Sequence, residues 1–126
     1  MSQSAISAKV FAVYLFVAGA LLTTAPNLLL SILHIPETSE VWIRVVGLVA
    51  FMIGVYAWVA AAHEFKPFLV ASVYTRCVVF AAFTAFAVMG LASPMIMLFG
   101  VADLAGGIWT QLALRSDAAS SAHATA

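Results

Sequence analysis

The pattern of apolar and polar residues divides the chain into four long apolar runs separated by short polar turns. The runs cover about residues 7–25, 41–62, 68–91 and 95–114, and the polar turns include HIPETSE at 34–40, HEFKP at 63–67 and LASP at 91–94. Each run is close to the length of about 20 residues that an α-helix needs to cross a bilayer. The predicted fold is therefore all-α: an integral membrane four-helix bundle with short loops, forming one domain over residues 1–115.

Two segments fall outside this simple pattern. Pro26 interrupts the end of the first run, and a proline kinks or ends a helix because it has no backbone N–H to donate. Residues 27–34 are then either the last turns of a kinked helix or a separate short helix at the membrane interface, and the sequence leaves both open. The segment SDAASSAHATA at 116–126 is small, polar and aperiodic, which predicts a disordered tail.

The composition supports a membrane location and narrows the class of partner. Hydrophobic residues make up 65% of the chain and charged residues 8%, whereas a soluble domain is about half apolar and a quarter charged. Basic and acidic residues number five each, so no basic excess favours nucleic acid. The predicted partners are the lipid bilayer and a homo-oligomer or larger membrane complex, and nucleic acid is not expected.

The positions of the basic residues predict the orientation. Lys9, Lys66 and Arg115 fall on the side shared by the N-terminus, the second loop and the C-terminus, while the first and third loops contain no Lys or Arg. Because cytoplasmic loops are enriched in Lys and Arg, both termini are predicted to be cytoplasmic.

Besides Lys9 near the start of the first run, three charged residues lie inside the apolar runs. At 1.5 Å of rise per residue, Arg44 lies roughly 6 Å, Asp103 roughly 13 Å and Arg76 roughly 22 Å below the outer surface. An unpaired charge at such depth costs several kcal/mol, so Asp103 is predicted to pair with Arg44, with Arg76 or with both. Because two arginines share one aspartate, this group of three residues carries excess positive charge. Either Arg44 turns outward to Glu40 or the headgroups, or an anionic ligand compensates it.

Helical spacing identifies the neighbours of these charges. Thr110 shares the face of Asp103 together with three glycines, and Arg44 shares its face with two more. These glycine faces of the second and fourth helices are predicted to meet, since small residues allow close approach. Trp109 lies near the depth of Arg76 and offers it a cation–π contact. As an alternative to a structural ion pair, the following residues form a polar pocket for an anion, a quinone or a lipid headgroup: Arg44, Arg76, Asp103, Thr110 and Trp109.

The residues give little support for catalysis or for a bound metal. His34 and His63 belong to loops on opposite sides of the membrane and His123 to the tail, whereas a bis-histidine haem needs both ligands at one depth. Cys77 follows Arg76 directly, but adjacent helical side chains point about 100° apart, so Cys77 is interpreted as a small buried side chain. No catalytic residue, cofactor or metal is predicted.

Two stretches carry a resemblance to a known family. The proline followed by an apolar turn in APNLLLSIL, and the arginine with glycines in RVVGLVAFMIG, resemble the small four-helix DoxX-like bacterial membrane proteins and related families, over about residues 10–114. The resemblance implies a bundle in a bacterial inner membrane. In some relatives that bundle is an accessory subunit of a quinone-linked or thiol-linked redox complex.

Three functions are compatible with these features. The first is a non-enzymatic accessory or scaffold subunit whose helices are held together by the Arg/Asp cluster. The second is a small oligomeric transporter or channel that uses Asp103. The third is a lipid- or quinone-binding membrane enzyme or redox-complex subunit, in which Arg76 holds the headgroup or carbonyl.

Overall fold

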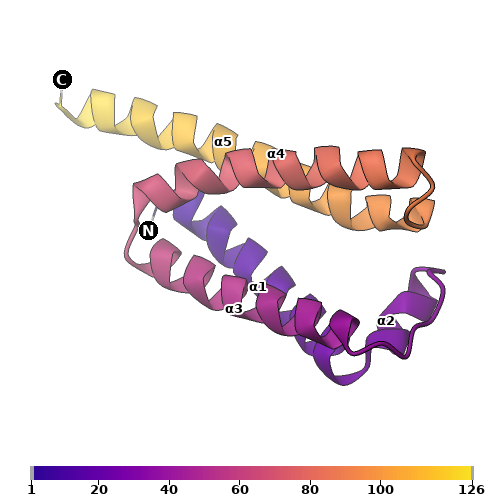
Figure 1. Ribbon diagram of the computed structural model, residues 1–126. Coiled ribbons are helices and arrows are strands. Elements are labelled where there is room, and N and C mark those ends of the chain that lie inside the picture. The colour runs from indigo at the N-terminus through magenta and orange to yellow at the C-terminus, as the bar shows by residue number, and fades with distance from the viewer. Residues whose placement is uncertain (1, 126) are drawn as a thin grey trace.

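The computed structural model describes residues 2–125 and is helical throughout, with no strand in those residues (Figure 1). The elements are α1 (Gln3–Thr24), α2 (Pro26–Ile32), α3 (Trp42–Ala62), α4 (Lys66–Val88), the 3₁₀ turn η1 (Pro94–Ile96) and α5 (Met97–Thr125). Four helices, α1, α3, α4 and α5 with its preceding turn, are long and apolar enough to cross a membrane. The prediction of an all-α fold with four long apolar helices is confirmed.

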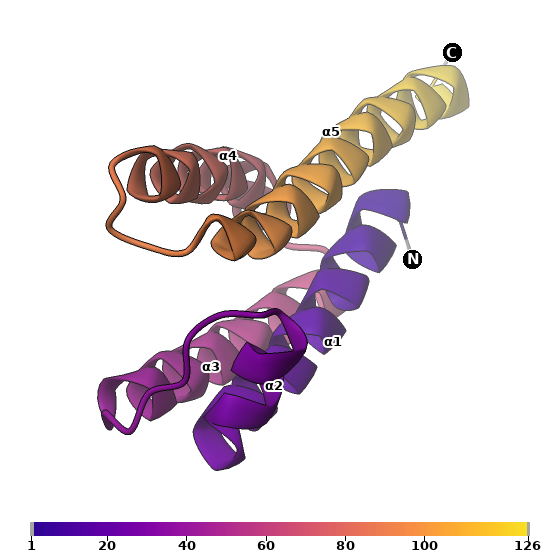
Figure 2. The same ribbon diagram turned by 90° about the vertical axis from the view of Figure 1, so that its right-hand side faces the viewer.

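The long helices form two antiparallel pairs, α1 with α3 and α4 with α5. The pairs are joined mainly by α1 packing against α5, while α3 has few contacts with α4. Figures 1 and 2 show that the pairs converge near the N-terminus and the α3–α4 loop and diverge towards α2 and η1. The arrangement is therefore a V that is open at one end.

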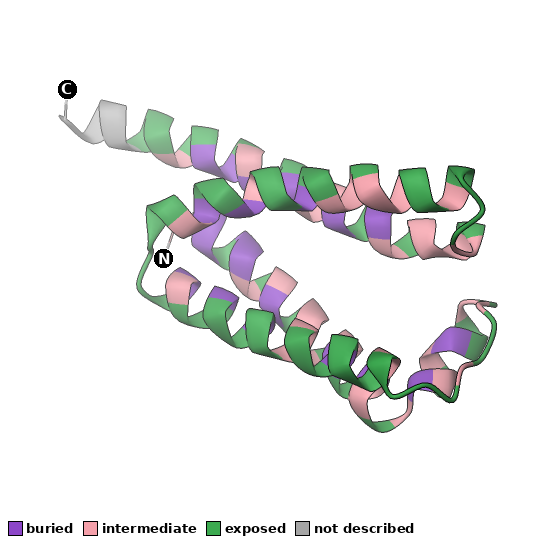
Figure 3. Ribbon diagram, in the orientation of Figure 1, coloured by how far each residue is buried: buried purple, intermediate pink, exposed green. Residues whose placement is uncertain are grey.

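Burial follows this arrangement. The buried residues lie on the sides where helices face one another, whereas most outward positions are exposed (Figure 3). Many of those exposed side chains are large and apolar, including Val17, Val78 and Val88. An apolar exterior of this kind is expected where lipid tails take the place of water.

Small residues bring α1 and α3 together. A Cβ built on Gly19 would lie 2.7 Å from the carbonyl oxygen of Gly47, and one built on Gly47 would lie 2.8 Å from the carbonyl oxygen of Gly19. Ala8 and Ala12 of α1 and Ala57 of α3 are fully buried nearby along these helices. Two backbones can approach this closely only where the side chains are small.

The predicted contact between the glycine faces of the second and fourth helices does not form. The glycines of α3 face α1 instead, and those of α5 face α4, where Gly100 lies against Phe80 and Phe83. The physical reason is that α1 carries its own row of small residues, which is complementary to the row on α3. This leaves α5 to pack its glycines against the aromatic face of α4.

The structure decides between the two alternatives at Pro26 and shifts both ends of α4 from their predicted positions. Ala25 leaves helical geometry, so Pro26 begins α2 as a separate short helix. α4 starts at Lys66, because Pro67 is tolerated in a first helical turn. It ends at Val88, because Gly90 adopts a positive φ of 75° and allows the N–H of Leu91 to donate to the carbonyl of Phe86 at 2.9 Å.

The C-terminal segment also differs from the prediction. A disordered tail was expected over residues 116–126, whereas α5 continues as a helix to Thr125, and residue 126 lies outside the described residues. Two causes are evident. The segment is rich in alanine, the strongest helix former. In addition, the Asp117 carboxylate accepts hydrogen bonds from the backbone N–H of Gln3 at 3.2 Å and of Ser4 at 3.1 Å, which attaches α5 to the start of α1.

A second acidic side chain binds the N-terminal end of α1. The Glu64 carboxylate, in the α3–α4 loop, accepts a hydrogen bond from the backbone N–H of Ser2. The N-terminus, the α3–α4 loop and Asp117 therefore meet at the convergent end of the V. Carboxylates are favourable there because the first N–H groups of a helix have no partner within it.

The pH dependence of this contact gives a first prediction. The backbone hydrogen bond from Ser2 lowers the pKa of Glu64 below its ordinary value of 4.5. A lowered pKa in the folded state means that the stabilisation is complete above the ordinary value and is lost as the pH falls through the folded value. Glu64→Gln should therefore lower the melting temperature at about pH 6, and this difference should be smaller at about pH 3.

The control for this measurement is Glu37→Gln, which changes the same chemical group at the opposite end of the molecule. Thermal melts of the three proteins across that pH range provide the comparison. If Glu64→Gln and wild type differed by the same amount at both pH values, the hydrogen bond from Ser2 would not be the source of the stabilisation.

Candidate functional site

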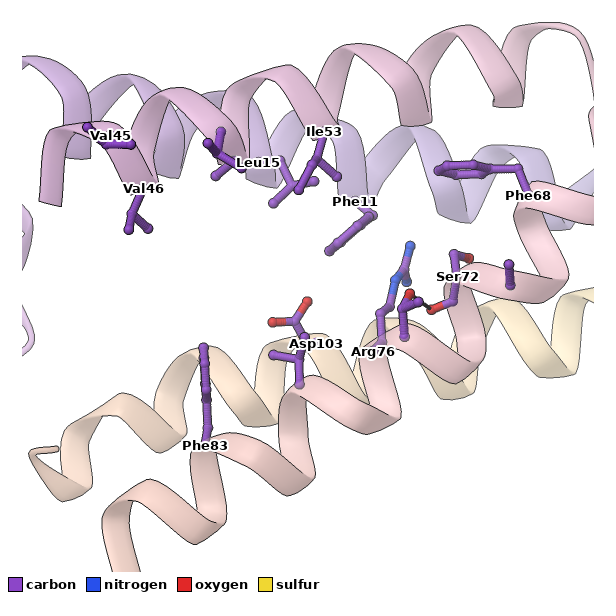
Figure 4. Close-up of a pocket in the computed structure, with 15 residues that line it drawn as sticks. Phe11, Leu15, Val45, Val46, Ile53, Phe68, Ser72, Arg76, Phe83 and Asp103 are labelled. Carbon is purple, nitrogen blue, oxygen red and sulfur yellow. Dashed lines mark hydrogen bonds between the residues drawn. The ribbon is translucent and has the colours of Figure 1, made fainter. Parts of the chain in front are cut away.

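The space between the two helix pairs is a cleft of about 640 Å³. It is lined by Phe11, Leu15, Val45, Val46, Val49, Ala50, Ile53, Phe68, Ala71, Ser72, Thr75, Arg76, Val79, Phe83 and Asp103. The wall formed by α1 and α3 is entirely apolar. All four polar lining residues lie on the opposite wall, formed by α4 and α5 (Figure 4).

Arg76 is the most deeply buried charged residue among the described side chains, with 2% of its surface exposed. Its guanidinium carbon lies 3.6 Å from the ring centroid of Phe11, a cation–π contact. Its Nη1 donates to the Thr110 hydroxyl at 3.4 Å, which is long for a hydrogen bond. Its Nε and Nη2 atoms are buried and have no hydrogen-bond partner among the described residues. Most of the guanidinium's donor capacity is thus unused.

Glycines of α5 make room for this side chain. A Cβ built on Gly106 would lie 2.9 Å from Nη1 of Arg76, and one built on Gly107 would lie 3.4 Å from Cβ of Arg76. Because neither position carries a side chain, the guanidinium can pass across α5 towards α1. The glycines that the sequence assigned to the face of Asp103 therefore accommodate Arg76.

A chain of hydroxyl groups fixes the one donor that Arg76 uses. The Thr110 hydroxyl is fully buried and lies 2.8 Å from the Ser7 hydroxyl, which in turn donates to the carbonyl oxygen of Ser4 at 2.7 Å. Since Thr110 accepts from Arg76, its own proton is free to bond to Ser7. These contacts join α4, α5 and α1 at the convergent end.

Asp103 faces the same cleft without binding Arg76. Its carboxylate points into the space between the helix pairs (Figure 4). The predicted ion pair is not formed, because Nη1 of Arg76 bonds to Thr110 and its other two nitrogens are unpartnered. Thr110 lies seven residues beyond Asp103, about 10 Å along the helix. The arginine therefore extends away from the acid, towards the convergent end.

Arg44 is not part of the cluster. Its side chain is exposed, and its Nη1 donates to the carbonyl oxygens of Thr23 at 2.6 Å and Thr24 at 3.2 Å. The last carbonyls of a helix have no partner within it and carry partial negative charge, so an arginine binds well there. The surplus positive charge inferred from the sequence is therefore taken up by the end of α1, and the cleft contains a single base and a single acid.

Two further side chains lie elsewhere than predicted. Trp109 is 44% exposed on the outside of α5, and the aromatic partner of Arg76 is Phe11. Phe11 was not identified from the sequence because it belongs to another helix, and spacing within α4 or α5 contains no signal for it. Cys77 is exposed on the outer face of α4, so it is not the buried side chain that was expected.

The candidate metal ligands do not cluster. Among the described residues, no group of three or more His, Cys, Asp or Glu side chains could hold a metal ion. The side chain of His123 lies outside those described. The chemistry of the cleft therefore rests on Arg76, Asp103 and the hydroxyl groups beside them.

Comparisons of the chain with protein-family models, with curated proteins and with solved structures give no match. The resemblance to DoxX-like membrane proteins stays a prediction from the sequence.

Proposed function

We propose that the protein is a non-enzymatic membrane binding protein that holds an amphiphilic molecule of the bilayer in the cleft between its two helix pairs. The observation that carries this proposal is the state of Arg76. It is buried at membrane depth, and two of its nitrogens lack a partner in the part of the chain that the structure describes. Leaving a buried charged donor unsatisfied is costly. A ligand in the cleft that supplies acceptor atoms removes that cost when the arginine side chain turns its covered nitrogens towards it.

The dimensions and lining of the cleft suit such a ligand. Its volume of about 640 Å³ falls within the range of about 300–1,000 Å³ that is typical of small-molecule sites. Those sites are mostly apolar and contain a few polar groups that orient the ligand. Here the apolar wall of α1 and α3 would contact a hydrocarbon tail, and Arg76 would hold the polar head.

The polar groups of the cleft favour binding over catalysis. The hydroxyl of Ser72 donates to the carbonyl of Leu69 at 2.8 Å, and that of Thr75 donates to the carbonyl of Ser72 at 3.0 Å. Neither hydroxyl has a basic side chain in hydrogen-bond contact within the described residues, so neither is activated as a nucleophile. A binding protein that works alone or as an accessory subunit of a larger complex fits this arrangement.

We further propose that the protein resides in a bacterial inner membrane with its convergent end in the cytoplasm. Lys9, Lys66 and Arg115 belong to segments near that end, and the positive-inside rule supports this orientation. The orientation would place the open end of the V towards the outer surface.

The proposed function is tested by filling the cleft. Native mass spectrometry of the protein purified in mild detergent should show a retained amphiphile. Val49→Trp, which adds bulk to the apolar wall, should remove it. Val59→Trp is the matched control, because Val59 lies on the same helix, is about equally exposed and does not line the cleft. Absence of any retained molecule in wild type, or equal retention in both variants, would refute the proposal.

A further inference from the structure

We infer that the head of the bound amphiphile is neutral and carries both a hydrogen-bond acceptor, for Arg76, and a hydrogen-bond donor, for Asp103. This inference rests on the proposed function and specifies its ligand. An ester with free hydroxyl groups, such as a monoacylglycerol, is a molecule of this class.

The charge in the cleft is balanced. Arg76 and Asp103 are the two lining residues with a formal charge, and their charges are opposite. Arg44, which would have made the site positive, is bound to the carbonyls at the end of α1. An anionic head placed at Arg76 would be repelled by Asp103 in the same apolar space, and a cationic head would be repelled by Arg76. A neutral head also avoids the cost of removing its own charge from water.

The hydrogen-bonding groups are complementary in type. A guanidinium offers only donors, whereas an ionised carboxylate offers only acceptors. Nε and Nη2 of Arg76 have no partner among the described residues but are covered by protein atoms, whereas the Asp103 carboxylate points into the cleft (Figure 4). One molecule can bind both once the flexible arginine side chain turns its guanidinium towards the cleft. A head with acceptors alone would satisfy Arg76 and leave Asp103 without a donor.

The order of the lining residues orients such a ligand. Ser72 and Arg76 lie towards the convergent end, Asp103 follows, and Val46 and Phe83 lie towards the open end (Figure 4). The polar contacts therefore occupy the inner half of the cleft. The tail would extend from the head along the apolar wall towards the open end.

The test uses ligands that share one hydrocarbon chain and differ in the head. Purified protein, stripped of its retained molecule, is incubated with equal concentrations of monooleoylglycerol, methyl oleate or oleyl sulfate, and bound fractions are read by native mass spectrometry. Monooleoylglycerol supplies an acceptor and donors, methyl oleate supplies acceptors only, and oleyl sulfate is an anion. Wild type should bind monooleoylglycerol roughly tenfold more tightly than either of the others. This difference in affinity corresponds to the free energy of about one hydrogen bond to a charged group.

Asp103→Asn should shift this preference towards oleyl sulfate, because it leaves the charge of Arg76 unbalanced. Glu40→Gln, which neutralises an acid outside the cleft, should leave the preference unchanged. The wild-type series decides the inference even if Asp103→Asn does not fold. A preference for oleyl sulfate or methyl oleate, or no preference, would overturn the inference that the head is neutral and contacts both Arg76 and Asp103. The proposed binding function would still hold in that case. Failure to bind any of the three would overturn both.

Discussion

Arg76→Gln is expected to weaken the binding of the amphiphile without lowering the thermal stability of the protein. Glutamine keeps a polar side chain of moderate length but cannot supply the charged donors at Nε and Nη2. Each hydrogen bond to a charged group contributes about 1.5–3 kcal/mol, so the affinity should fall roughly tenfold to a hundredfold. Removing a buried charge that is largely unpartnered should leave the melting temperature unchanged or raise it.

This result separates two accounts of the buried charges. If Arg76 and Asp103 served mainly to hold the helices together, Arg76→Gln would lower the melting temperature and affect binding only through unfolding. Melts and native mass spectra of the same preparations provide both readouts. Retention of the amphiphile at wild-type affinity in a folded Arg76→Gln protein would contradict the role assigned to the guanidinium.

A second variant keeps the arginine and tests whether the position of its guanidinium matters for binding. In Gly106→Ala the new Cβ would lie 2.9 Å from Nη1 of Arg76, which is the far end of a flexible side chain and can move. The charge remains and the protein should fold, but the guanidinium is displaced from its position against Phe11 and Thr110. The affinity should therefore fall by less than in Arg76→Gln. An unchanged affinity would show that the position of the guanidinium does not matter.

Gly47→Ala is expected to have the largest effect on folding. The added Cβ would lie 2.7 Å from Cβ of Leu22, 2.7 Å from the backbone nitrogen of Thr23 and 2.8 Å from the carbonyl oxygen of Gly19. Two of these atoms are backbone, so relief requires α1 and α3 to separate. Overpacking of a close interface costs about 1–3 kcal/mol and sometimes more. A large loss of folded, monodisperse protein in detergent is therefore expected.

The matched control is Gly100→Ala, the same substitution within α5. The nearest atom to a Cβ at Gly100 is Cβ of Phe83 at 3.5 Å, an ordinary contact. Alanine is also the better helix former by about 1 kcal/mol, so this variant should be as stable as wild type or more stable. The size-exclusion profiles and melting temperatures of Gly47→Ala and Gly100→Ala provide the comparison. Equal behaviour would contradict the close approach of α1 and α3.

The features that could be predicted from the sequence are those that depend on local pattern. Four spans follow from apolar runs of bilayer length, and the break at Pro26 follows from its missing donor. The helical pairing could not be predicted in the same way. Glycines recur on several helices, and the partner of Gly47 is decided by the row of small residues on α1, in which alanines contribute as much as Gly19.

Of the candidate residues, Asp103 and Arg76 line the cleft. The sequence predicts that Asp103 and Arg76 face the interior, because charged residues at membrane depth must face inward. Depth along the bilayer, however, does not fix the direction in which a long side chain extends across neighbouring helices. Arg76 extends to Phe11 of α1, and Arg44 extends to carbonyls about twenty residues earlier in the chain. Both contacts depend on tertiary packing and have no signal in the spacing of one helix.

The most direct test of the central claim, that the cleft is the binding site, is photolabelling with a monooleoylglycerol that carries a diazirine in its tail. Peptide mapping should place the label on the cleft residues of α3 and α4, such as Val49, Ile53 and Phe83, and Val49→Trp should reduce it. The outward residues Tyr74 and Val78 are exposed but do not line the cleft, and they serve as the internal reference. Labelling of Tyr74 and Val78 as strong as that of the cleft residues, and unaffected by Val49→Trp, would contradict the account.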